Sequence, residues 1–184
     1  MIVYLHGFNS SPQSHKAQLM QRYMGERGLA LEFACPALPH APRDAVRLIG
    51  SVAGDKPVCY VGSSLGGFYA TYFVETRGAR AVLINPAIDP HIGLAAYLGP
   101  QRNLYTGEPY ELTASHLAQW RELYVPEITP ERYLLLVETG DEVLDYRRAV
   151  ERYAGAEQVV IAGGDHSLRS FPEHLPRILR FAGY

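Results

Sequence analysis

Short apolar runs alternate with amphipathic segments along most of the chain. The first run covers residues 1–5, and the segment after it has apolar residues at helical spacing. Apolar runs of about four to eight residues bounded by turn residues are typical of buried strands, whereas spacings of about three and four are typical of helices. The pattern predicts six strands, at residues 1–5, 29–35, 58–61, 79–84, 133–137 and 158–161.

The segments between these strands carry the signals of helix ends. Ser11, followed by Pro12, is the expected N-cap of the first helix, and Ser170 with Glu173 forms a capping-box pattern before the last. Pro176 is expected to kink that last helix or to delay its start. The predicted helices cover residues 11–26, 43–52, 68–76, 145–154 and 170 onward.

This order of elements indicates the fold class. Strands that alternate with helices favour a parallel sheet covered on both faces and joined by right-handed crossovers. A dinucleotide-binding fold is the competitor, but its first strand-to-helix turn carries a glycine fingerprint that residues 6–9 lack. We therefore expect an α/β fold: a three-layer sandwich around a six-stranded, mostly parallel sheet, forming one domain over residues 1–184.

The regular alternation stops between residues 86 and 130. This segment is rich in proline, glycine and aromatic residues, and Thr113 is the expected N-cap of a helix within it. We expect the segment to leave the sheet as a small cap over the strand ends. Aromatic side chains such as Tyr105 and Trp120 are candidate substrate contacts, because they offer apolar walls with polar tips. The alternative is that they only pack the excursion onto the sheet.

Charge, cysteine content and the lack of long apolar runs indicate the partners, the redox state and the location to expect. The 17 basic and 19 acidic residues give a net charge of -2, which gives no indication of nucleic acid or an anionic membrane as a partner. Cys35 and Cys59 lie in or beside apolar runs and are expected to be reduced thiols. No signal peptide or membrane-spanning run is recognisable, so the expected location is the cytoplasm. We expect no metal and no organic cofactor, and the sequence leaves the oligomeric state open.

A glycine-rich turn with two adjacent serines follows the run at 58–61. In a nucleophile elbow the chain turns so sharply that the residues two before and two after the nucleophile nearly touch, which favours glycine at both places. Counted from Ser64, these places hold Gly62 and Gly66, whereas counted from Ser63 they hold valine and leucine. Ser64 is therefore the candidate nucleophile. The alternative is a turn that binds phosphate or only redirects the chain. For phosphate binding, however, the motif lacks both the Gly-Lys-Ser/Thr ending and the Gly-x-Gly-x-x-Gly spacing.

Two later strand ends carry the partners that a serine nucleophile needs. A base must accept the serine proton, and an acidic group must orient the base. Asp141 and His166 each follow a predicted strand and a glycine turn, and the order Ser64, Asp141, His166 is that of α/β-hydrolase triads. Asp145 is the alternative acid, although an N-cap explains it better. His6 is the alternative base, although its place beside a glycine favours a role in shaping the first turn.

For the remaining polar groups near these strand ends we expect structural roles or backbone contacts. Glu138 and Glu142 are expected to be solvated loop carboxylates, and Asp165 to shape its own turn through an Asx hydrogen bond. An oxyanion hole needs two backbone donors, for which we expect the N–H groups of Leu65 and Phe8. Asn9 is the second choice for the latter donor and a further candidate substrate contact.

With these motifs in place, the sequence resembles the YqiA/YcfP-like small bacterial α/β-hydrolases, a family of esterases. The resemblance covers nearly the whole chain in order. It implies an α/β-hydrolase fold and a serine carboxylesterase, acting on esters or acyl-CoA thioesters through Ser64, Asp141 and His166. The blocks that carry it are residues 4–12, 61–67, 85–87, 105–107, 139–146 and 163–166.

Two hypotheses of function follow. The first is a serine hydrolase that forms an acyl-enzyme intermediate with a small-molecule ester or thioester; peptidase and acyltransferase chemistry share the same triad and stay open. The second is a noncatalytic ligand-binding or interaction protein on a hydrolase fold. Loss of a triad member is the usual sign of the second class, and this sequence has all three.

Overall fold

A computed structural model describes all 184 residues and contains a six-stranded parallel sheet with the strand order β2-β1-β3-β4-β7-β8. Every neighbouring pair is parallel. The strands are β1 (Ile2–Leu5), β2 (Phe33–Ala34), β3 (Cys59–Ser63), β4 (Arg80–Ile84), β7 (Tyr133–Glu138) and β8 (Glu157–Ile161). The prediction of six parallel strands is confirmed. Their carboxyl ends meet at one edge, where ligands bind in sheets of this class.

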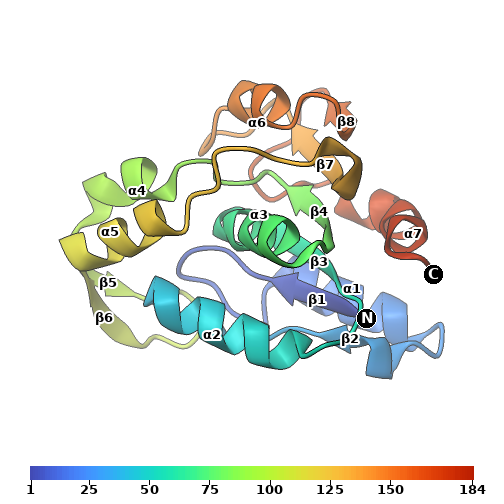
Figure 1. Ribbon diagram of the computed structural model, residues 1–184, viewed down its shortest axis with the longest axis horizontal. Coiled ribbons are helices and arrows are strands. Elements are labelled where there is room, and N and C mark those ends of the chain that lie inside the picture. The colour runs from blue at the N-terminus through green and yellow to red at the C-terminus, as the bar shows by residue number, and fades with distance from the viewer.

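Helices cover both faces of this sheet (Figure 1). One face packs against α2 (Pro42–Ala53), α3 (Leu65–Arg77) and α6 (Tyr146–Arg152), and the other against α1 (His15–Gly25) and α7 (Phe171–Ala182). Alternate strand residues enter the two cores: Val3 and Leu5 face the first, whereas Ile2 and Tyr4 face the second. Because both faces are buried, the strands read as continuous apolar runs in the sequence.

Some element ends differ from the sequence prediction. The first helix begins at His15, since the Ser11 hydroxyl accepts a hydrogen bond from the Gln13 N–H and closes a local turn before it. The run at 29–35 forms a 3₁₀ turn, Ala30–Glu32, and the short β2. The last helix starts at Phe171 without a capping box, because the Ser170 hydroxyl donates instead to Glu138. Pro176 lies inside that helix and does not delay its start.

Residues 86–130 lie between β4 and β7 and leave the main sheet. The elements are α4 (Pro90–Gly93), a 3₁₀ turn (Leu94–Tyr97), the antiparallel β5 (Gly99–Arg102) and β6 (Pro109–Leu112), α5 (Ala114–Glu122) and a final 3₁₀ turn (Pro130–Arg132). Figure 1 shows α4, β5, β6 and α5 gathered at one end of the molecule, away from both termini. Thr113 is the N-cap of α5, as expected, and it forms a capping box in which the His116 ring accepts from the Thr113 N–H.

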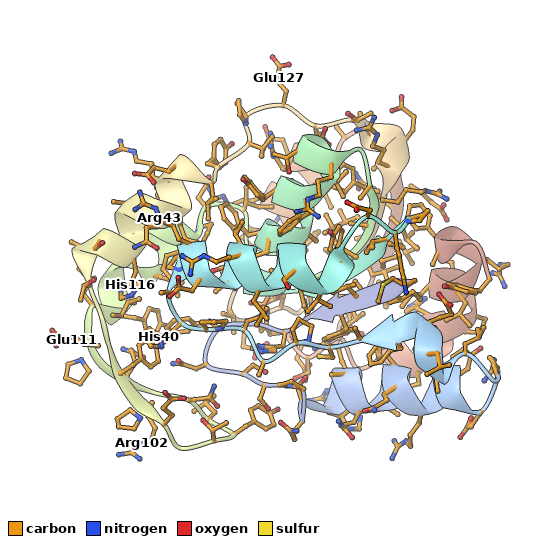
Figure 2. The ribbon with its side chains drawn as sticks, turned by 60° about the horizontal axis from the view of Figure 1, so that its bottom comes forward. His40, Arg43, Arg102, Glu111, His116 and Glu127 are labelled. Atoms are coloured by element: carbon orange, nitrogen blue, oxygen red, sulfur yellow. The ribbon has the colours of Figure 1, made fainter.

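The excursion is fixed to the rest of the molecule along the start of α2 and the loop before it. Arg43 bonds to Glu122 at 2.6 Å, and its N–H donates to Gln119. The His40 ring stacks on Tyr110 with centroids 4.4 Å apart. Figure 2 shows His40 and Arg43 on this flank, facing the excursion. None of the helices is both long and apolar enough to cross a membrane.

Candidate active site

Ser64 connects β3 to α3 in a conformation that few residues other than glycine adopt. Its φ is 54° and its ψ is -120°, whereas the preceding Ser63 ends β3 and is buried. The Ser64 N–H donates to the Ile84 carbonyl oxygen at 3.0 Å, and its own carbonyl oxygen accepts from Gly67 and Ala87. These bonds offset the backbone strain that a positive φ imposes on a side-chain-bearing residue. They leave the Ser64 side chain directed into a cleft.

Two glycines allow this turn to be tight. A Cβ added to Gly62 would lie 2.4 Å from the Gly66 carbonyl oxygen. A Cβ added to Gly66 would lie 1.9 Å from the Leu5 carbonyl oxygen at the end of β1. Since both contacts are with backbone atoms, no side-chain rotation relieves them. The residues two before and two after Ser64 thus approach closely, which is the reason that the glycines at these places pointed to Ser64 in the sequence.

Asp141 and His166 come together at the ends of β7 and β8. The His166 Nδ1 lies 2.8 Å from the Asp141 Oδ2, and the other carboxylate oxygen of Asp141 accepts from the N–H groups of Val143 and Leu144. Burial raises the pKa of Asp141, but the bonds from His166 and Leu144 outweigh it and hold this pKa below its usual value. The carboxylate thus stays ionised and holds a proton on Nδ1, which leaves Nε2 free to accept another.

The other acidic residue weighed for this position has a different role. The Asp145 carboxylate accepts from the Arg147 N–H at 3.1 Å and caps α6, as expected. Asp165 shapes its own turn by accepting from the Ser167 N–H, also as expected. The contact with His166 is therefore made by Asp141 alone among these three carboxylates.

Glu138 is buried and accepts hydrogen bonds from the His166 loop, so it is not the solvated carboxylate that the sequence suggested. Its side chain is 1% exposed, and its two oxygens accept four hydrogen bonds. The donors are the N–H groups of Asp165, Arg169 and Ser170 and the Ser170 hydroxyl, at 2.7 to 3.0 Å. Burial raises the pKa of Glu138, but these bonds outweigh it, so that the pKa lies below its usual value.

Asn85 and Glu142 hold the same loop from its other sides. The Asn85 amide donates to the carbonyl oxygens of Asp165 and His166 and accepts from the Glu138 N–H. The Glu142 carboxylate accepts from the His166 N–H at 2.9 Å, so this residue too is more than a solvated loop carboxylate. These contacts fix the backbone of His166 on both its N–H and its carbonyl side.

Two backbone N–H groups are available next to Ser64. Neither the Leu65 N–H, at the start of α3, nor the Phe8 N–H, in the turn after β1, has an acceptor in the protein. The turn lies against the nucleophile: a Cβ added to Gly7 would be 3.2 Å from the Ser64 Cβ. This arrangement is the one that an oxyanion hole requires.

His6 shapes that turn and has no free nitrogen for proton transfer. Its Nε2 accepts from the Leu38 N–H at 3.0 Å, which places the ring proton on Nδ1, where it faces the Gly7 carbonyl oxygen at 3.1 Å. Burial lowers the pKa of His6. The ring is therefore a neutral structural element, as its position beside a glycine suggested.

Ser64 and His166 line one cleft of about 570 Å³. No hydrogen bond joins the Ser64 and His166 side chains. The apolar part of the wall contains Phe8, Leu104 and Tyr105, the last of which is half-exposed. No group of three or more His, Cys, Asp or Glu side chains is arranged to hold a metal ion.

Two of the expected substrate contacts need correction. Trp120 is 1% exposed in the core, where its Nε1 donates to the Tyr69 hydroxyl, and it does not line the cleft. Asn9 lines a neighbouring cavity of about 420 Å³, and its amide bonds to Gln101 and Tyr110. Both side chains therefore attach the excursion to the rest of the domain, Trp120 through α3 and Asn9 through the turn after β1. Tyr105 remains the one of the three that faces the cleft.

Three residues have roles that were not predicted from the sequence. They are Glu138, expected to be a solvated loop carboxylate, Asn85, and Lys16, which lines the cleft from α1. A signal for Glu138 was present, since it directly follows a continuous apolar run and a strand buried on both faces has no solvated side. Asn85 stands in the same position after β4. Lys16 carries no such signal, because the orientation of one helical residue depends on where the helix begins.

Solved structures with a similar fold define the class of fold. Mouse alpha/beta hydrolase domain-containing protein 10 superposes with a TM-score of 0.75 over 97% of this chain and 87% of its own, at 18% identity. Est1E from Butyrivibrio proteoclasticus with bound ferulic acid gives a TM-score of 0.68 over 98% and 86%, at 16% identity. The chain has the α/β-hydrolase fold.

Sequence comparison identifies the family. The model of the "Uncharacterised protein family (UPF0227)" matches residues 1–183, and the chain belongs to this family. A UPF0227 protein from Pectobacterium carotovorum is 26% identical over 188 residues, which cover 98% of each chain. The resemblance seen in the sequence motifs is thereby confirmed at the level of family and fold.

Proposed function

We propose that this protein is a serine hydrolase that cleaves carboxylic esters or thioesters of small molecules through an acyl-enzyme intermediate. The observation that carries the proposal is the convergence on one cleft of a strained Ser64 and a His166 whose ring is oriented by Asp141. A noncatalytic protein has no need to keep a strained serine beside an oriented imidazole.

The chemistry follows from the positions of these groups. The Ser64 Oγ attacks the substrate carbonyl carbon while the His166 Nε2 takes the hydroxyl proton. The carbonyl oxygen becomes an oxyanion that the N–H groups of Leu65 and Phe8 stabilise. As the tetrahedral intermediate collapses, the bond to the alcohol or thiol breaks and His166 gives that group its proton.

The second half of the reaction repeats these steps with water. His166 takes a proton from water, and the hydroxide oxygen bonds to the acyl carbon held on Ser64. When this second intermediate collapses, the proton returns to the Ser64 Oγ and the carboxylic acid leaves. Throughout, the Asp141 carboxylate balances the positive charge that His166 carries.

The substrate class is supported by the cleft and by the comparison proteins. Phe8, Leu104 and Tyr105 give part of the cleft an apolar surface that suits an acyl chain or a small aromatic group. Est1E, which shares the fold, has been solved with the aromatic acid ferulic acid. We therefore expect short-chain or aromatic esters to be accepted, with residues 86–130 as the cap of a single domain.

A hydrolysis screen across esters, thioesters and peptides tests the proposal. Ser64→Ala should abolish turnover of every accepted substrate, since it removes the proposed nucleophile. Ser63→Ala, one residue away and buried, is the matched control and should retain activity. Equal activity of the Ser64→Ala protein and the unaltered protein on a purified chromogenic ester would reject the assignment.

A further inference from the structure

The cleft that contains Ser64 has a single lysine in its wall. Lys16 lies in the first turn of α1, and its Nζ donates to the Ser167 carbonyl oxygen at 2.7 Å. Because Ser167 directly follows His166, the Lys16 ammonium lies beside the loop that carries the triad base. It is therefore placed where it can contact a substrate during proton transfer.

This ammonium has no carboxylate partner. No Asp or Glu oxygen lies within 4.0 Å of the Lys16 Nζ, and Ser167 accepts only one of its three N–H bonds. Arg148, the other lysine or arginine in the cleft wall, is paired with Asp89. A partly buried cation without a counter-ion is costly, so a bound anion there would be stabilised.

The start of α1 adds to the positive potential at this wall. The N–H groups of residues 15–17 have no acceptor in the protein, and the neighbouring Ser14 hydroxyl is buried without a hydrogen bond. Uncapped N–H groups and the helix dipole both favour negative charge. Burial lowers the pKa of Lys16 to about 8, and this effect outweighs the carboxylates of Asp165, Glu138 and Asp141, which raise it.

We infer that Lys16 is a specificity-determining residue that binds an anionic group, a carboxylate or a phosphate, on the leaving-group side of the substrate. The inference rests on the proposed function. His166 hands its proton to the departing alcohol or thiol, so that group passes beside the loop that Lys16 contacts. An anion on the leaving group would come within reach of the two free N–H bonds of the ammonium.

Two pairs of substrates test the inference and distinguish the anions. The first pair is 4-acetoxybenzoate and its neutral analogue 4-acetoxybenzamide, and the second is acetyl-CoA and the uncharged S-acetyl-N-acetylcysteamine. We expect at least one anionic member to be favoured in kcat/KM by about tenfold, the size expected for one charge-assisted hydrogen bond. This ratio should fall as the pH rises through about 8, where Lys16 loses its proton.

Variants of Lys16 separate charge from structure. Lys16→Met removes the charge and keeps much of the stem, whereas Lys16→Gln also keeps a donor for Ser167. Both should reduce the anionic-to-neutral ratio to near one and remove its pH dependence. Lys56→Met is the matched control, because Lys56 is the other lysine of the chain, is exposed and lies outside the cleft.

The role of Lys16 and the proposed hydrolase function can fail independently in these experiments. An unchanged ratio in Lys16→Met, with hydrolysis still dependent on Ser64, would overturn the role of Lys16 and leave the hydrolase standing. An equal loss on both members of a pair would also overturn it, and would make Lys16 a counter-ion for the His166 loop. Calorimetric binding of 4-hydroxybenzoate against 4-hydroxybenzamide to the Ser64→Ala protein gives a readout without turnover; equal affinities for the two would count against the inference.

Discussion

Replacing Glu138 with glutamine probes the group that holds the His166 loop in place. The carboxylate accepts from the N–H groups of Asp165, Arg169 and Ser170 and from the Ser170 hydroxyl. A glutamine side chain has one oxygen, and its NH₂ group must face two of these donors. The least costly orientation turns the NH₂ toward Ser170, because the hydroxyl can rotate and accept.

The cost of this substitution can be worked out from the four bonds. In that orientation the Ser170 N–H loses its acceptor, which costs about 1–3 kcal/mol for a buried donor. The N–H groups of Asp165 and Arg169 exchange a charged acceptor for a neutral one, at about 0.5–1 kcal/mol each. We expect Glu138→Gln to lower the free energy of unfolding by about 3 kcal/mol near pH 7. Activity should fall by about tenfold or more, since the loop carries His166.

The lowered pKa of Glu138 determines how the loss of stability in Glu138→Gln depends on pH. The pKa of Glu138 is lower in the folded protein than its usual 4.5, so ionisation favours the folded state. That stabilisation is fully present above about pH 4.5 and is lost as the pH falls through the lower pKa of the folded protein. The difference in stability between the unaltered protein and Glu138→Gln should therefore shrink on acidification.

Urea denaturation followed by far-UV circular dichroism at several pH values between about 3 and 7 measures both effects. Ser170→Ala is the matched control, because it removes one donor and leaves the carboxylate and the three N–H groups in place. It should cost about 1 kcal/mol. A Glu138→Gln protein within about 0.5 kcal/mol of the unaltered one at pH 7, or a difference that does not change with pH, would refute the reasoning.

Three further substitutions test separate parts of the account. Asp141→Asn should keep the fold and reduce kcat by about 10³–10⁴-fold, since it favours the wrong tautomer of His166; steady-state kinetics with a loss below tenfold would speak against it. Trp120→Ala should cost about 3–5 kcal/mol of stability in denaturant titrations without a specific change in acyl preference, because Trp120 lies in the core. Gly66→Ala should abolish folding of the elbow, as its Cβ would lie 1.9 Å from a carbonyl oxygen, whereas Gly25→Ala meets no atom within 4 Å; similar melting temperatures for the two would contradict this.

The fold was largely predictable because its signals are local. A strand buried on both faces must be apolar throughout, so the runs at 58–61, 79–84 and 133–137 each mark a central strand of the sheet. The pair of glycines around Ser64 likewise reflects a local contact, since a Cβ on Gly62 would meet the Gly66 carbonyl oxygen. Element ends were less predictable: the Ser170 hydroxyl was free to cap a helix in the sequence but is used by Glu138 in the structure.

The hydrogen-bond partners of the supporting residues were not predictable, because they lie in distant parts of the chain. Glu138 and Ser170 are 32 residues apart, and Lys16 and Ser167 are 151 apart. Trp120 illustrates the converse: an aromatic residue in the excursion suits a substrate pocket, yet its N–H is satisfied by Tyr69 inside the core. Composition suggests which side chains could contact a ligand, but only packing decides which of them face the cleft.

The central claim is that Ser64 is an activated nucleophile, and covalent labelling tests it most directly. A fluorophosphonate should modify the protein once, and tryptic mass spectrometry should place the adduct on Ser64. We predict that Ser64→Ala abolishes labelling, whereas Ser63→Ala retains it. A folded protein that is not labelled at all, or a Ser64→Ala protein that is labelled as fast as the unaltered one, would contradict the account.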